Sequence, residues 1–147
     1  MAAVEAVRVA TWKVAYRGLL PDELLDRLKV TEVGVAKWND MLVKGEVATV
    51  VAVDDKAVVG FASCGRCRDA DLPDARELWA VYVLPAYWAT GTGARLLAAA
   101  GDIDVVWVLQ GNERAIAFYE RQGFRADGTA KVLDHIGGAT DVRYVRP

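Results

Sequence analysis

The sequence predicts one domain of the mixed α/β (α+β) class, with a parallel strand–helix–strand unit at its centre. Its 147 residues fit a single domain, 1–147, and 54% of them are apolar, which is enough for a core of that size. Predicted helices come first, then a hairpin, and then strands that alternate with helices. The stretch from Val83 to Val105 is long enough for a parallel crossover.

The first third of the chain predicts helices. Apolar residues recur at helical spacing over residues 2–16, and Gly18 follows that pattern as a terminator. Pro21 suits the first turn of a second, short helix. Thr31 is a good N-cap for a third helix that extends to about Lys44.

The rest of the chain alternates strand and helix patterns. β-branched and apolar runs predict strands at 47–53, 57–64, 77–83 and 105–109, with a polar loop at 65–76. Two further strands are expected in the tail, at 131–136 and 141–145, around a pair of glycines. Helices are expected at 92–100 and 113–122, the second capped by Asn112 and ended by Gly123.

Composition excludes several classes of partner. The formal net charge of −2 gives no signature of nucleic-acid or membrane-surface binding. The first residues contain no long apolar segment of the secretion-signal type, and no apolar run approaches membrane-spanning length. A cytoplasmic protein with neither a nucleic-acid nor a membrane partner is therefore expected.

The pair Cys64 and Cys67 has a spacing that invites a metal or redox interpretation. A structural zinc site needs four ligands, and His135 is the only further soft candidate. A thioredoxin-like context is also missing. No metal is therefore expected, the cysteines are interpreted as ordinary residues at a strand end, and His135 as a structural residue in a strand.

Two glycines, Gly91 and Gly93, stand where a predicted strand gives way to a helix. A helix N-terminus carries free N–H groups and partial positive charge, so a phosphate fits there when no side chain blocks its approach. The N–H groups up to Ala94 and Arg95 would then cradle a pyrophosphate, although a simple turn explains the glycines too. Leu96 excludes the Rossmann fingerprint, which needs a small residue there.

Two segments together carry a family resemblance. ELWAVYVLPAYWATGTGARLL, followed by WVLQGNERAIAFYERQGF, resembles the GNAT superfamily of N-acetyltransferases at its pyrophosphate motif and at the next strand and helix. The resemblance covers almost the whole chain. It implies a mostly antiparallel sheet with helices on both faces. It also implies a bulged strand over Glu77–Val83 that splays from the strand Val105–Leu109 and leaves a gap for the pantetheine arm.

The resemblance also implies a chemistry, in which acetyl-CoA is the co-substrate and an amine attacks it directly. Glu77 matches the general base that deprotonates the amine. Tyr119 matches the acid that protonates the leaving thiolate, with an ordinary pKa of about 10. Asn112 caps its helix, contacts the cofactor, or does both. The implied cofactor-binding residues are Val81, Tyr82, Val83, Trp88, Ala89, Thr90, Gly91, Thr92, Gly93, Ala94, Arg95, Asn112 and Phe118.

The chain also departs from the family pattern. It starts within the first expected helix, Trp88 and Thr90 replace usual polar or basic residues, and the helix after the glycines is short. Two functions therefore stay open: N-acetyl transfer to a primary amine, or a non-catalytic acyl-CoA-binding or interaction module. The acceptor, a small molecule or a peptide, is not specified, and a homodimer is a further expected partner. Trp12, Tyr16 and Trp38 belong to the core or to one wall of the acceptor pocket.

Overall fold

A six-stranded sheet forms the centre of the computed structural model, which describes all residues 1–147. The strand order is β1-β2-β3-β4-β6-β5, and every neighbouring pair is antiparallel except β3 with β4. This arrangement confirms the expected class of fold. The strands are β1 (Ala48–Asp54), β2 (Ala57–Arg66), β3 (Arg76–Val83), β4 (Val105–Leu109), β5 (Arg125–Leu133) and β6 (Ala139–Val145).

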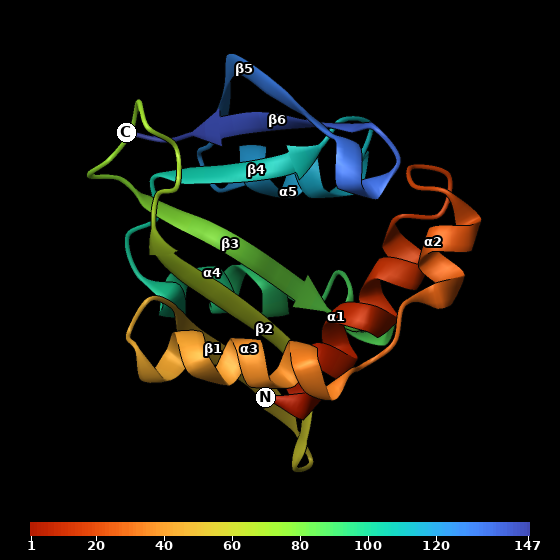
Figure 1. Cartoon of the computed structure of the whole chain (residues 1–147). Coiled ribbons are helices and arrows are strands. Elements are labelled where there is room, and N and C mark those ends of the chain that lie inside the picture. Colours follow the sequence, from red (N-terminus) through yellow and green to blue (C-terminus); the bar gives the residue numbers. More distant parts are fainter.

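Helices cover both faces of the sheet. In Figure 1, α1, α2 and α3 lie in front of the sheet, whereas α4 and α5 lie behind it. Their bounds are α1 (Ala2–Ala15), α2 (Asp22–Arg27), α3 (Glu32–Val43), α4 (Thr92–Ala100) and α5 (Glu113–Arg121), with short 3-10 turns η1 (Pro85–Tyr87) and η2 (Asp134–Ile136). None of these helices is long and apolar enough to span a bilayer.

The core has two layers because successive strand residues point to opposite faces. Behind the sheet, the larger cluster joins Leu96 and Leu97 of α4 to Tyr119 of α5 and to the strands. In front, a smaller cluster packs Val4 and Val7 of α1 against the sheet. Each face of the sheet is therefore covered by its own cluster of apolar side chains.

The central parallel pair is very short. Only Glu77 with Val105 and Leu78 with Val106 are in register, after which β3 and β4 separate (Figure 1). The ladder with β2 is irregular at this level, because Leu78 pairs with Cys64 and Ala80 pairs with Ser63, which leaves Trp79 as an extra residue. The bulged, splayed strand implied by the family resemblance is present.

The short crossover closes through local pairing at its end. The backbone N–H of Asp104 donates to the Arg76 carbonyl at 2.9 Å, and the N–H of Arg76 donates to the Asp104 carboxylate at 2.9 Å. Ile103 is 1% exposed and joins the larger cluster. A nine-residue α4 is therefore sufficient to return the chain to the start of β4.

The tail differs from the expected pattern. The strand expected at 131–136 is instead β5, which begins at Arg125, and its last expected residues form η2. The expected start was wrong because the strand contains a bulge at Gly128, whose φ is +88°. The polar residues around this glycine have the sequence pattern of a loop, although they belong to β5. His135 consequently lies exposed in η2 and not in a strand.

Candidate active site

The two glycines at the start of α4 have different physical roles. Gly91 is the N-cap residue with a φ of +83°, a left-handed conformation that favours glycine, and a Cβ there would meet no atom within 4 Å. Gly93 has ordinary helical geometry, but its Cβ would lie 3.3 Å from the ring of Phe118. The first glycine is required by backbone conformation and the second by close packing.

The turn presents unsatisfied donors. None of the backbone N–H groups of residues 91–94 donates to an acceptor within the chain, and the first bond of the new helix runs from Arg95 N–H to the Gly91 carbonyl. Gly91 and Arg95 are exposed. The Thr90 hydroxyl faces the backbone, where it donates to the Tyr87 carbonyl. Free amide hydrogens on a helix start with an adjacent cation form a good anion site.

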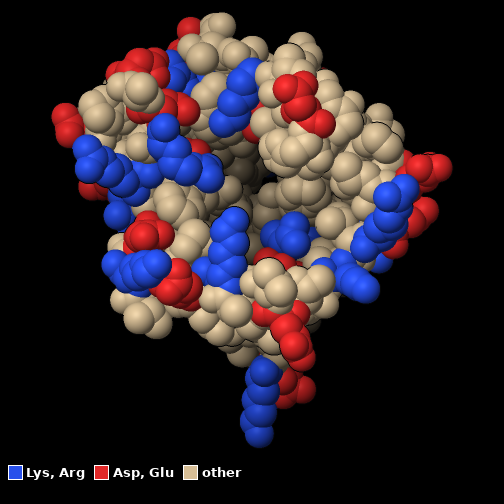
Figure 2. Space-filling model, viewed as in Figure 1, with Lys and Arg blue, Asp and Glu red and all other residues tan.

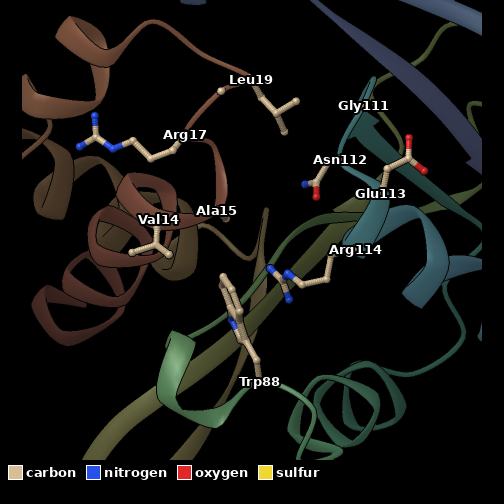
Figure 3. Close-up of a pocket in the computed structure, with 10 residues that line it drawn as sticks. Val14, Ala15, Arg17, Leu19, Trp88, Gly111, Asn112, Glu113 and Arg114 are labelled. Carbon is tan, nitrogen blue, oxygen red and sulfur yellow. The ribbon is translucent and has the colours of Figure 1, made fainter.

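A cavity of about 330 Å³ opens between the end of α1, Trp88 and the start of α5 (Figure 3). The Arg114 guanidinium lies 3.6 Å from the centroid of the Trp88 ring, and Figure 3 shows the two side chains facing each other. Burial lowers the pKa of Arg114. The lining residues are Val14, Ala15, Arg17, Gly18, Leu19, Trp88, Gly111, Asn112, Glu113 and Arg114.

Asn112 caps α5 and also forms part of the cavity wall. Its side-chain oxygen accepts from the Ala115 N–H at 3.4 Å, which caps α5. The residue is 8% exposed and lines the cavity. The side-chain amide is therefore held in place by the helix while its residue forms part of the cavity wall.

Alternate side chains at the end of β3 point to opposite faces of the sheet. Val81 and Val83 pack against the larger cluster behind it, whereas Tyr82 packs against the smaller cluster in front. The Val83 carbonyl accepts a hydrogen bond from Trp88 Nε1 at 2.7 Å and a long one from the Thr11 hydroxyl at 3.4 Å. A backbone acceptor that was expected to pair with pantetheine is engaged by the chain itself in this conformation.

Tyr119 lies on α5 beneath the sheet and is 6% exposed. Its ring packs edge-on against Phe118 at 5.3 Å and against Phe124 at 5.9 Å. Burial raises the pKa of Tyr119 well above that of a free tyrosine; Tyr82 adds to the rise and Arg114 opposes it. The hydroxyl therefore keeps its proton at neutral pH, as a general acid must.

Glu77 is 1% exposed and does not line the cavity. Arg68 binds it three times: through Nη2 at 2.7 Å, Nε at 3.3 Å and the backbone N–H at 3.0 Å. The structure thus packs Tyr119 against Phe118, whose ring lies against Gly93 in the first turn of α4. It places Glu77 at the opposite end of β3, in an ion pair with Arg68.

Sequence reasoning missed Arg114 and Asp141, and it did not predict the contact between Tyr16 and Tyr82. Arg114 lies two residues after the N-cap Asn112, in the first turn of α5, so the capping pattern contained a signal for it. The Tyr16 and Tyr82 hydroxyls lie 3.4 Å apart, a contact across 66 residues that no local pattern shows. Asp141 shares a strand face with Arg143, which the period of two in β6 would have revealed.

The cysteines form neither a disulfide nor a metal cluster. Cys64 and Cys67 are free and buried. Arg76 donates to the Cys64 sulfur at 2.9 Å. No group of three or more His, Cys, Asp or Glu side chains is placed to hold a metal ion.

Comparison with known proteins gives consistent results. Residues 45–126 match the family described as an acetyltransferase (GNAT) domain. The uncharacterized N-acetyltransferase YuaI of Bacillus subtilis is 32% identical over 126 residues, which cover 80% of this chain and 70% of that protein. An uncharacterized N-acetyltransferase of Mycobacterium bovis is 33% identical over 132 residues, which cover 84% of this chain and 82% of that protein.

Among solved structures, the PaiA N-acetyltransferase of Thermoplasma acidophilum in complex with coenzyme A has a TM-score of 0.73. The two chains are 20% identical, and the match covers 96% of this chain and 89% of that one. At this identity the likeness concerns the fold alone.

Proposed function

Because the chain belongs to the GNAT acetyltransferase family, we propose that it transfers an acetyl group from acetyl-CoA to a primary amine. One observation carries the proposal: the open row of amide hydrogens at residues 91–94 lies beside the helix that holds Tyr119, with Phe118 in contact with Gly93. The acceptor is a small molecule or a peptide that bears the amine.

In this proposal the diphosphate of acetyl-CoA binds the free N–H groups at the start of α4, where Arg95 adds positive charge. The pantetheine arm then occupies the cavity beside Asn112 and Arg114. To pair with the Val83 carbonyl it must displace the Trp88 indole, which occupies that acceptor at 2.7 Å. Trp88 thus replaces the usual polar residue of the motif with a side chain that the cofactor has to move.

The reaction follows from the two titratable groups. An amine is mostly protonated at pH 7, so one N–H bond must break before the nitrogen attacks the thioester carbon, and we assign that proton to Glu77 through water. As the C–N bond forms, the C–S bond breaks and the thiolate takes a proton from Tyr119. Arg68 must first leave Glu77, and its side chain is 59% exposed, so solvent is available to it on departure.

The test is direct. The protein is incubated with acetyl-CoA and a panel of primary amines while the release of free thiol is followed. A second panel, of alcohols in place of amines, serves as the chemical control. Amine-dependent thiol release that requires Tyr119 supports the proposal. Absence of thiol release across the amine panel, with bound CoA confirmed by calorimetry, contradicts it.

A non-catalytic acyl-CoA-binding module is the second candidate. The observation that favours it is the capture of both Glu77 oxygens by Arg68, which leaves no free carboxylate at the expected base position. Calorimetry with CoA separates the two functions, because the module binds the cofactor without amine-dependent turnover. Absence of CoA binding would contradict both.

A further inference from the structure

A second cavity, of about 520 Å³, lies where β2 ends and β3 begins, at the end of β3 opposite to Trp88. No residue lines both cavities, and neither Glu77 nor any residue assigned above to acetyl-CoA lines this one. Small-molecule sites usually have volumes of about 300–1,000 Å³. The second cavity is therefore large enough for a small organic ligand, and it is separate from the site of the proposed acetyl transfer.

Two arginines stand opposite each other at this cavity. Arg66 is the last residue of β2 and Arg76 is the first residue of β3, and the two are directly paired in the antiparallel ladder. Both line the cavity. Like charges at directly opposite positions of a sheet repel each other and lower its stability. The stability of the sheet therefore does not account for this pair.

Neither arginine has a carboxylate partner. No Asp or Glu oxygen lies within 4.0 Å of a side-chain nitrogen of Arg66 or Arg76. Arg66 Nε donates to the Pro73 carbonyl at 2.9 Å. Arg76 Nη2 donates to the Cys64 sulfur at 2.9 Å and to the Ala100 carbonyl at 3.4 Å. These acceptors are neutral, and sulfur is a weak one, so both positive charges are left without a counter-charge.

The other charged residues at the cavity do not supply that counter-charge. Arg68 also lines the cavity, but its guanidinium is held by Glu77. Glu46 is the only acidic lining residue, and it is exposed and forms no ion pair. Asp104 accepts from the backbone N–H of Arg76 and not from its guanidinium.

Figure 2 shows Lys and Arg side chains gathered on the left of the molecule, over the region where β2 ends and β3 begins in Figure 1. A cavity with an excess of positive charge attracts anions. A guanidinium carries five N–H groups in a planar fork that matches the oxygens of a phosphate or carboxylate. Both Nη atoms of Arg66, and Nε and Nη1 of Arg76, donate to no acceptor within the protein.

We propose that this cavity binds a small dianion, a phosphate monoester or a dicarboxylate, between Arg66 and Arg76. A dianion neutralises both guanidinium groups at once and thereby removes the repulsion across the two strands. The site is independent of acetyl transfer, so it stands whether or not the chain acetylates an amine.

The test follows the amide chemical shifts of Gly65 and Trp79, which line the cavity, while the protein is titrated with inorganic phosphate and separately with succinate. CoA is present throughout to keep phosphate from the free N–H groups at residues 91–94. Sodium chloride at the same ionic strength gives the response to salt alone. Saturable shifts with one or both dianions support the site and identify the class of ligand. Shifts equal to those with chloride, or none with either dianion, overturn it.

Two variants assign the binding to the arginine pair. Arg66→Gln is expected to raise Kd for the bound dianion about tenfold or more, because a charged donor is lost. Arg66 is exposed and its side chain bonds only the Pro73 carbonyl, so this variant should fold. Arg121→Gln, the same change at an exposed residue of α5 that lines neither cavity, should keep the wild-type Kd. An unchanged Kd in Arg66→Gln, or an equal loss in Arg121→Gln, overturns the assignment.

Discussion

Arg68 holds both carboxylate oxygens of Glu77 while its guanidinium lies 4.7 Å from the centroid of the Trp79 ring. The ion pair joins a 1%-exposed carboxylate to a side chain that is largely in solvent. Trp79 is the bulged residue of β3, and its ring lies over Gly65, where a Cβ would come within 3.0 Å of it. The bulge, the glycine and the ion pair thus form one structure at the start of the central strand.

Arg68→Ala is expected to lower the free energy of unfolding by about 1–3 kcal/mol, because Glu77 stays buried with only the backbone N–H of residue 68 as donor. Solvent around Arg68 places the effect near the lower end of that range. Urea unfolding of Arg68→Ala, Glu77→Gln and the double variant measures the coupling of the two side chains. A coupling energy of zero would show that the contact contributes nothing.

Tyr119→Phe is expected to lower kcat by about 10²-fold with KM for acetyl-CoA unchanged, because only the proton donor is removed. Burial raises the pKa of Tyr119, so this hydroxyl should stay protonated below pH about 10. Deprotonation of Tyr119 should therefore not lower the wild-type kcat in that pH range. Steady-state kinetics across pH measure both effects. Tyr87→Phe is the matched control, because that hydroxyl bonds Asp54 on the distant hairpin; an equal loss there would contradict a specific role.

The two glycines of the turn should respond differently to alanine. Gly91→Ala strains a left-handed residue and is expected to cost about 1 kcal/mol of stability, with free space for the new methyl group. Gly93→Ala brings its Cβ to 3.3 Å from Phe118, so α4 or Phe118 must shift and CoA binding should weaken. Thermal unfolding and CoA calorimetry on both variants test this; unchanged CoA affinity in Gly93→Ala would refute the packing argument.

Asp141→Asn should stabilise the protein at neutral pH. The pKa of Asp141 is raised in the folded state by burial, so the native state holds this proton more tightly than the unfolded chain does. Stability therefore falls as pH rises from the ordinary aspartate pKa through the raised one, and the loss is complete above it. The variant lacks this loss, so its Tm advantage should appear at pH 7 and vanish near pH 3; an advantage independent of pH would contradict the cause.

Much of the fold was predictable because it depends on local pattern. The helical spacing of residues 2–16, the apolar strands and the cap at Asn112 each determine an element from neighbouring residues. The one wrong strand, expected at 131–136, arose where Asp127 and Gly128 gave a turn pattern inside a strand that is held by its pairing with β6. Pairing with a distant segment overrode local preference there.

By itself the sequence determined the elements, their order and the glycine turn before α4, since backbone conformation and amide hydrogens at a helix start follow from adjacent residues. Only the tertiary structure decided which side chains meet. It placed Arg68 on Glu77 and Trp88 on the Val83 carbonyl, and it brought the hydroxyls of Tyr16 and Tyr82 within 3.4 Å of each other. The physical reason is that burial and neighbouring charges determine the pKa and the binding partners of a carboxylate. Both depend on segments that lie far apart in the chain.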